Sequence, residues 1–279
     1  MGAGYCSVGL LVGVDLLERL MIEKAAEILR NAQSSRQPCE PLAQKFALSA
    51  EDAYRIQQIN IELRTGAQGV DAPVIVGRKV GLTSDAIQAW LKVNQPDFGT
   101  LLSDMSVLNG GTAPIEFLLQ PRAEAEVAFV LKHDLAGPGV TPKDVIRATE
   151  FVLPAIEIID SRIHDWKITF EDTVADNASS AMFVVGNEPR DLKEVDLRLC
   201  GAVLRKNGAV VSTGAGVACL GHPVHAVAWL ANTLGRIGSG IRAGELVLSG
   251  ALGPVTPVQK GDWLVADING LGSCSVRFG

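Results

Sequence analysis

Apolar side chains recur at helical spacing in the first part of the chain. Residues 21–32 carry them three and four positions apart, which is typical of an amphipathic helix. A second helix is expected to begin after Ser49, which can serve as its N-cap with Asp52 three residues later, and to end before Gly66. These patterns predict a helical N-terminal part of about residues 21–70.

Short apolar runs separated by turn residues dominate the rest of the chain and indicate strands. Strands are expected within residues 74–84, 94–105, 120–131, 151–162 and 181–185, and through most of the tail from residue 196. Helices are expected at residues 85–92, where Ile87 and Leu91 should be buried, and at 141–150 and 222–235. The mixture predicts an α+β fold. Because no internal repeat or long linker is visible, we expect residues 21–279 to form a single catalytic domain and residues 1–20 to be an extension of uncertain structure.

Composition narrows the classes of function. The chain has 279 residues, 47% of them hydrophobic, and a net charge of −6, so it is expected to be globular and to bind no nucleic acid. Its five cysteines show no metal-ligand spacing and indicate reduced thiols. The apolar start near residues 9–14 has no basic flank and meets Asp15 early, so no membrane segment is expected. A cytoplasmic enzyme or binding protein fits best.

Two carboxylates stand two residues apart in the predicted strand at 120–131. Side chains of a strand alternate between its faces, so Glu124 and Glu126 share one face. Burying both without a cation would be costly. A hard divalent ion such as Mg²⁺ or Mn²⁺ prefers carboxylate oxygen and would resolve this cost. A solvated pair on an edge strand is the alternative.

Other charged residues also occupy apolar surroundings. Glu157 lies in the middle of an apolar strand and is the natural third metal ligand, whereas Asp160 falls on the opposite face and should be structural. Lys79 lies between Gly77 and Gly81, where a backbone or ligand could approach closely. Its charge suits it as a partner for the carboxylates, although most lone lysines are solvated.

Two further segments have ambiguous chemistry. Asp97 lies between a proline and a glycine, where an aspartate is usually an ordinary turn residue. Residues 173–180 form a predicted polar loop of small side chains, which suits a carboxylate or water pocket but also a simple turn. Histidines 133 and 164 are expected at the surface, and His222 is expected to be a cap or a packing residue at the start of a helix.

Several long motifs carry a family resemblance, and they occur in the same order along residues 21–279. They are VGRKVGLTS, NQPDFGTLLSDM, QPRAEAEVAFVL, VLPAIEIIDSRI, DTVADNASSAMFVVG, GHPVHAVAWLANTLG and GELVLSGALGP. Together they resemble the 2-hydroxypenta-2,4-dienoate hydratases, also called 2-keto-4-pentenoate hydratases, of the fumarylacetoacetate hydrolase superfamily. The resemblance implies a mixed β-roll or barrel flanked by helices.

The resemblance also implies roles for individual residues. Glu124, Glu126 and Glu157 would bind Mg²⁺ or Mn²⁺, with Lys79 beside the ion. Ser179 would help to hold the carboxylate of a small dienoic acid. The acid–base role is assigned to Asp97, with Lys79 as the second choice.

The implied activity is a hydro-lyase reaction in meta-cleavage aromatic catabolism, which converts 2-hydroxypenta-2,4-dienoate into 4-hydroxy-2-oxopentanoate. The 4-oxalocrotonate decarboxylases resemble the chain in the metal residues and the VADNASS block but generally lack the aspartate of PDFG, so Asp97 favours hydration. No equivalent of the His–Glu pair of acylpyruvate hydrolases is evident.

Three alternatives remain at this point: decarboxylation of 2-oxo-3-hexenedioate, hydration of a longer dienoate, and an inactive partner subunit. A second substrate carboxylate would need another cation, for which Arg78, Arg122 and Arg162 are candidates. The resemblance further implies a homo-oligomer and association with a decarboxylase or aldolase of the same pathway.

Overall fold

The computed structural model describes residues 6–66 and 72–279, with the side chains of the first helix described from Leu17 onward. Its helices are α1 (Cys6–Ser35), α2 (Leu42–Lys45), α3 (Ala50–Thr65), α4 (Asp85–Leu91), α5 (Pro142–Ala148), α6 (Phe170–Ala175) and α7 (Pro223–Arg236). Its strands are β1 (Ile75–Gly81), β2 (Asp97–Leu102), β3 (Ser106–Val107), β4 (Thr112–Ala113), β5 (Arg122–Leu131), β6 (Thr149–Ile159), β7 (Ser180–Val185), β8 (Gly201–Lys206), β9 (Ala209–Ala215), β10 (Leu246–Ala251), β11 (Thr256–Pro257), β12 (Trp263–Ile268) and β13 (Gly272–Phe278).

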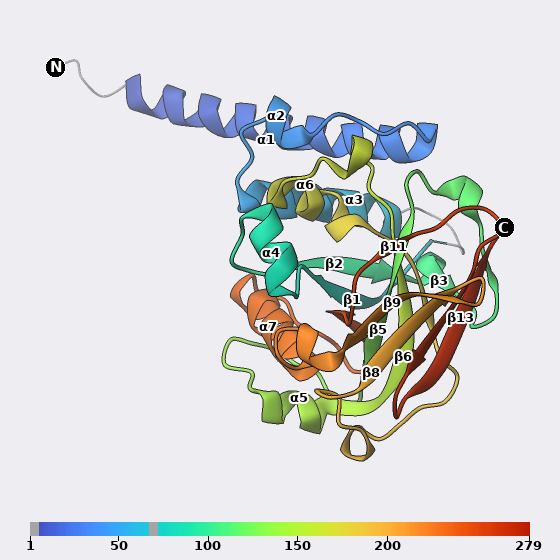
Figure 1. Cartoon of the computed structure of the whole chain (residues 1–279). Coiled ribbons are helices and arrows are strands. Elements are labelled where there is room, and N and C mark those ends of the chain that lie inside the picture. The colour runs from blue at the N-terminus through green and yellow to red at the C-terminus, as the bar shows by residue number, and fades with distance from the viewer. Residues whose placement is uncertain (1–5, 67–71) are drawn as a thin grey trace.

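The strands of the described residues form two sheets (Figure 1). The larger sheet has the order β2-β1-β10-β5-β6-β7-β3, and β11 pairs with the start of β5. The smaller sheet has the order β4-β13-β12-β8-β9. Both sheets mix antiparallel pairs with parallel ones, such as β1 with β10 and β4 with β13. The predicted α+β fold with mixed sheets is confirmed.

The two faces of β5 have different surroundings. Val127 and Phe129 are fully buried in the main hydrophobic core, together with residues of the second sheet and α7. Glu124 and Glu126 lie on the opposite face because successive side chains of a strand alternate. This alternation lets one strand serve both the core and a polar site.

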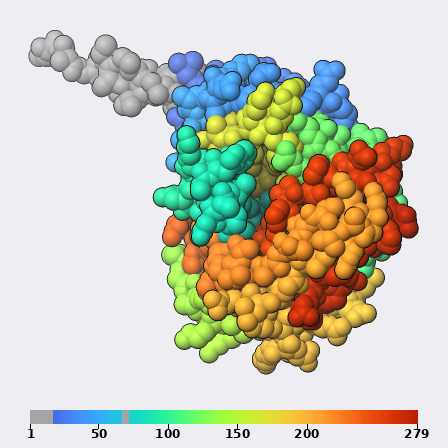
Figure 2. All heavy atoms as spheres, viewed as in Figure 1, coloured from blue at the N-terminus to red at the C-terminus, as the bar shows by residue number. Residues whose placement is uncertain are grey.

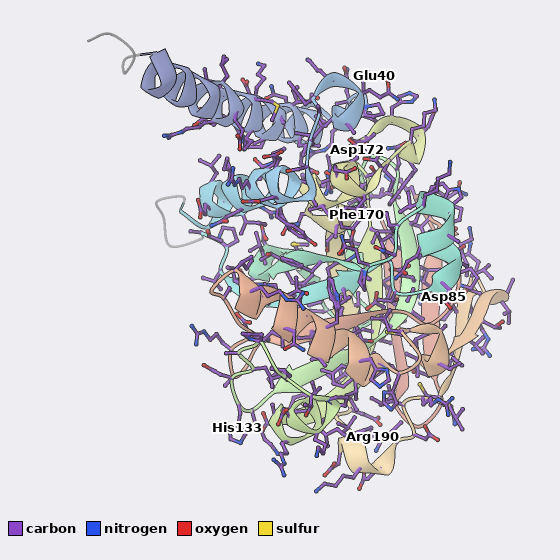
Figure 3. All side chains as sticks on the ribbon, turned by 90° about the vertical axis from the view of Figure 1, so that its left-hand side faces the viewer. Glu40, Asp85, His133, Phe170, Asp172 and Arg190 are labelled. Atoms are coloured by element: carbon purple, nitrogen blue, oxygen red, sulfur yellow. The ribbon has the colours of Figure 1, made fainter. Side chains whose placement is uncertain are left out.

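Helices α1, α3 and α6 pack together at one end of the molecule (Figure 1). Ile22, Ile56 and Phe170 share a hydrophobic cluster there. Asp172 completes the capping box of α6 and also accepts a hydrogen bond of 3.0 Å from the backbone N–H of Ala43. Figure 3 labels Phe170 and Asp172 at this junction. None of the described helices is long and apolar enough to span a bilayer.

The start of the first helix differs from the expectation. Residues 1–5 of the predicted extension lie outside the described part of the chain, and α1 runs without a break from Cys6 past Met21. No proline interrupts this stretch, and Gly9 and Gly13 lower the helix propensity without ending the helix. The predicted helix start at Met21 is therefore wrong, whereas the division into an extension and a domain of residues 21–279 stays a prediction.

Two other local expectations need correction. The predicted polar loop at 173–180 begins inside α6, because the Thr169 cap and the buried Val174 extend the helix through Ala175. The apolar face of α4 is not buried in the core, since Ile87 and Leu91 are only partly covered. Both side chains line a cavity instead.

Candidate metal centre and substrate cavity

The pairing of β5 with β6 brings three glutamates together. Glu124 lies directly opposite Glu157 in the antiparallel ladder, and Glu126 follows two residues later on the same face. Each residue offers a carboxylate oxygen within 4.8 Å of those of the other two. All three side chains are buried, and Glu126 and Glu157 are fully so. The structure therefore places the predicted ligand residues in one cluster.

Burial and mutual repulsion make the charged forms of these carboxylates unfavourable in the absence of a cation. Burial, and then the neighbouring Glu157, raises the pKa of Glu124 to about 7. The same causes raise the pKa of Glu126 well above its ordinary value. Glu126 Oε2 accepts a hydrogen bond of 2.7 Å from the N–H of Gly250, but Glu126 Oε1 and both oxygens of Glu157 have no hydrogen-bond partner. Such a set of unpartnered oxygens fits a hard divalent cation.

Lys79 provides the cation closest to the cluster. It projects from β1 and is almost fully buried, with its Nζ 3.2 Å from Oε2 of Glu157 and donating a hydrogen bond of 3.1 Å to the carbonyl of Ala178. Burial by itself lowers the pKa of Lys79, but Glu157 and the other carboxylates of the site outweigh it and raise the pKa. Lys79 therefore stays charged.

Asp97 lies at the start of β2, paired with the end of β1, and it is buried. A Cβ added to Gly81 would meet Asp97 Oδ1 at 2.2 Å and Lys79 Nζ at 3.2 Å, so the absence of a side chain at Gly81 lets the two charged groups approach. Burial raises the pKa of Asp97 to about 6, although Lys79 opposes the shift. Its Oδ1 has no hydrogen-bond partner, and Thr173 donates to Oδ2 at 3.4 Å.

Ser179 belongs to a left-handed turn. Asn177, Ala178 and Ser179 all have positive φ angles, of 57°, 50° and 51°. A non-glycine residue in this region costs of order 1–3 kcal/mol and persists only where the surroundings hold it. Such strain is common at functional sites.

Hydrogen bonds from several elements hold this turn. The side-chain amide of Asn177 bonds both the N–H and the carbonyl of Thr100 in β2, at 2.8 and 2.9 Å. The hydroxyl of Ser179 donates to Asp176 at 3.2 Å, and Asp176 forms a buried ion pair with Arg162. The turn therefore connects β2, which carries Asp97, with the carbonyl of Ala178, which accepts the hydrogen bond of Lys79.

Sequence reasoning missed the Arg162–Asp176 pair as part of the site. In the sequence, both charged residues adjoin apolar segments, which suggests that they are buried. This pattern does not show that the two residues contact each other. Thr173 was included in a predicted loop, but its contact with Asp97 depends on the tertiary fold.

A cavity of about 560 Å³ joins these groups. Lys79, Asp97, Glu124, Thr173 and Ser179 line it. Of the three candidate arginines, Arg122 lines the cavity, whereas Arg162 is paired with Asp176 and Arg78 donates to the carbonyl of Gly77. Figure 2 shows the surface hollowed between α4 and the C-terminal strands. A second cavity of about 700 Å³ lies over the smaller sheet and contains none of the predicted site residues.

The mixed-sheet fold carries a buried cluster of three carboxylates beside a lysine, a group that could hold a metal ion, and comparison identifies the family of the chain. Residues 73–278 match the family described as fumarylacetoacetate (FAA) hydrolase C-terminal, and the chain belongs to this family. It is 48% identical over 257 residues to 2-keto-4-pentenoate hydratase of Paraburkholderia xenovorans (strain LB400), covering 92% of this chain and 94% of that protein.

Two further relatives extend the comparison. The chain is 44% identical over 264 residues to 2-hydroxyhexa-2,4-dienoate hydratase of Comamonas testosteroni, covering 94% of this chain and 98% of that protein. Among solved structures, 4-oxalocrotonate decarboxylase from Pseudomonas putida G7, complexed with magnesium and adipate, is similar with a TM-score of 0.88 and 41% identity. That match covers 94% of this chain and 98% of the decarboxylase.

The Arg162–Asp176 pair gives a stability prediction. In Asp176→Ala the buried guanidinium loses its charge partner, and we expect the free energy of unfolding to fall by about 3–5 kcal/mol. Urea titration followed by circular dichroism measures the change. The control is Asp104→Ala, which removes a partly exposed ion pair with Arg64 and should cost about 0–1 kcal/mol. Equal effects of the two changes would contradict a supporting role for the buried pair.

Proposed function

We propose that the protein is a divalent-metal-dependent hydratase, which adds water to 2-hydroxypenta-2,4-dienoate and gives 4-hydroxy-2-oxopentanoate in meta-cleavage aromatic catabolism. Relatives with hydratase names at 44–48% identity support the reaction. The observation that carries the proposal is the cluster of three buried carboxylates. Within it, Glu126 Oε1 and Glu157 Oε1 have no partner, and Glu157 Oε2 has only its ion pair with Lys79.

Glu124, Glu126 and Glu157 would hold the ion, and Mg²⁺ or Mn²⁺ suits their oxygen donors. When bound, the cation acts as a Lewis acid on the 2-oxygen of the substrate. Lys79 offsets the excess negative charge and attracts the anionic substrate. Ser179 donates its hydroxyl to the substrate carboxylate in place of Asp176.

Asp97 is the general acid and general base of the proposed mechanism. Its pKa of about 6 makes both the acid and the carboxylate available near neutral pH. The acid delivers a proton to C5 of the dienol while the 2-hydroxyl loses its proton to solvent, and the resulting 2-oxo-3-enoate is electrophilic at C4. The carboxylate of Asp97 then accepts a proton from the water that adds at C4, and it returns that proton to C3 of the enolate to give 4-hydroxy-2-oxopentanoate. The unpartnered Oδ1 is the atom free for this exchange.

The second candidate is decarboxylation of 2-oxo-3-hexenedioate. The decarboxylase that is 41% identical to the chain and the presence of Arg122 in the cavity favour it, because a second carboxylate requires another cation. A homo-oligomer, a pathway partner and a cytoplasmic location stay predictions from the sequence.

An assay with both substrates separates the two reactions. With 2-hydroxypenta-2,4-dienoate and Mg²⁺ we expect loss of the dienol absorbance without release of CO₂, and NMR should identify 4-hydroxy-2-oxopentanoate. Faster turnover of 2-oxo-3-hexenedioate with stoichiometric CO₂ would establish the decarboxylase instead. No metal-dependent turnover of either compound would contradict both candidates.

Asp97→Asn tests the proton-transfer role. The amide has the same shape but cannot exchange protons, so we expect kcat to fall by about 10²–10⁴-fold while the Kd for Mg²⁺ changes little. At saturating Mg²⁺, wild-type kcat/KM should fall as the pH rises through about 6, because Asp97 must be protonated to deliver its proton to C5, and the variant should lack this limb. Asp104→Asn, at a partly exposed site, is the control. A variant with normal kcat would remove Asp97 from the mechanism.

Glu126→Gln tests the metal site. Glutamine keeps an acceptor for the Gly250 N–H but loses the charge, so we expect Mg²⁺ affinity to fall by more than about tenfold. In the wild type, Mg²⁺ must displace protons from carboxyls whose pKa is raised, that of Glu124 to about 7. Affinity should therefore increase from pH 6 to pH 8.

Titration calorimetry in buffers with different ionisation enthalpies measures both the affinity and the protons released. Glu150→Gln, at an exposed position of β6, is the matched control. Unchanged Mg²⁺ binding in Glu126→Gln, or affinity independent of pH, would overturn the ligand assignment.

A further inference from the structure

The substrate cavity has two chemically different ends. Its inner end carries Lys79, Asp97 and Glu124. The remaining wall is largely apolar and comes from α4, the segment before α6, the end of β6 and the loop after β10. The apolar lining residues include Ile87, Trp90, Leu91, Ile159, Ile168 and Val255.

Helix α4 presents its apolar face to this cavity. Ile87, Trp90 and Leu91 are three and four residues apart, so they lie on one side of the helix. No residue of α4 is fully buried, and Trp90 is 63% exposed. Asp85, the first residue of α4, is exposed and is labelled in Figure 3. Covering such an apolar surface with an apolar group of a ligand is favourable, in proportion to the apolar area removed from water.

The cavity is also larger than the proposed substrate. The five-carbon dienoate has about eight non-hydrogen atoms, which fill roughly 240 Å³ if each takes the ~30 Å³ of a water molecule. The cavity volume is about 560 Å³. If the substrate carboxylate and 2-oxygen occupy the charged inner end, the substrate fills less than half of the cavity volume.

We propose that the outer end of the cavity binds an apolar group on C5 of the substrate, and that Trp90 determines specificity for it. This inference rests on the proposed function and deepens it: beside 2-hydroxypenta-2,4-dienoate, the site accepts, and prefers, 2-hydroxy-2,4-dienoates with an alkyl or aryl substituent on C5. Arg122 also lines the cavity, with its guanidinium over the ring of Trp166, 4.4 Å from the centroid, and a dicarboxylate substrate tests whether it binds a second carboxylate instead.

A series of substrates with apolar groups of increasing length on C5, here called the substrate tail, tests the proposal. We expect kcat/KM to rise by about threefold to fivefold for each methylene added to 2-hydroxypenta-2,4-dienoate, up to a butyl group on C5. Trp90→Ala should reduce the ratio of kcat/KM between the butyl and unsubstituted substrates by at least about tenfold, and Trp90→Phe should restore most of it. Trp263→Ala, on the smaller sheet, is the control that keeps the wild-type ratio.

Two results would overturn the proposal. One is a kcat/KM that does not depend on tail length, or a ratio that Trp90→Ala leaves unchanged. The other is a preference for the dicarboxylate 2-hydroxyhexa-2,4-dienedioate that Arg122→Leu abolishes, because it would make the outer end a carboxylate site.

A binding measurement separates this inference from the proposed reaction. In the presence of Mg²⁺, calorimetry should give a lower Kd for 2-oxononanoate than for 2-oxopentanoate, and Trp90→Ala should remove the difference. This result would support the tail site even if no dienoate were hydrated, in which case only the hydratase proposal would fail. Equal Kd values would overturn the tail site whatever the turnover.

Discussion

The convergence of buried negative charge on one face of β5 and β6 is the constraint on which the site depends. Glu124 and Glu157 are direct neighbours across the ladder, so their carboxylates are brought together by the same hydrogen bonds that build the sheet. In a buried environment this arrangement is unfavourable without positive charge. Lys79 provides part of that charge, and the proposed divalent cation would provide the rest.

The neighbouring structure holds the compensating groups in place. In the left-handed turn at Asn177 to Ser179, the carbonyl of Ala178 accepts a hydrogen bond from the ammonium of Lys79. The side-chain amide of Asn177 forms hydrogen bonds with β2. Because β2 also carries Asp97, a single strained turn connects the groups proposed to hold charge and to move protons. The conformational energy of such a turn is tolerated only where the surrounding structure holds the backbone in place. Here the pairing of β1 with β2 and the Arg162–Asp176 ion pair do so.

Sequence reasoning could find features that depend on local periodicity. The two-residue spacing of Glu124 and Glu126 and the apolar strand around Glu157 give the faces of β5 and β6 directly. Ser49 and His222 have the local chemistry of helix caps, and both accept hydrogen bonds as caps in the structure.

Features that depend on tertiary packing could not be predicted in the same way. The approach of Asp97 to Lys79 requires β2 to pair with β1 and Gly81 to lack a side chain. The cavity-facing side of α4 has the same residue pattern as a core-facing side, since Ile87 and Leu91 are apolar in either case. Periodicity identifies an apolar face but not what it faces.

The same distinction separates the two ends of the cavity. The inner end is built on paired strands, where charged groups with few alternative positions can be held at fixed distances. The outer end includes α4, a short helix with no fully buried side chain. Hydrophobic contact is not directional, so such a wall can accept groups of different shape without disturbing the charges at the inner end. This arrangement allows tail specificity to change by substitution in α4 while the strands keep the chemistry of the reacting atoms.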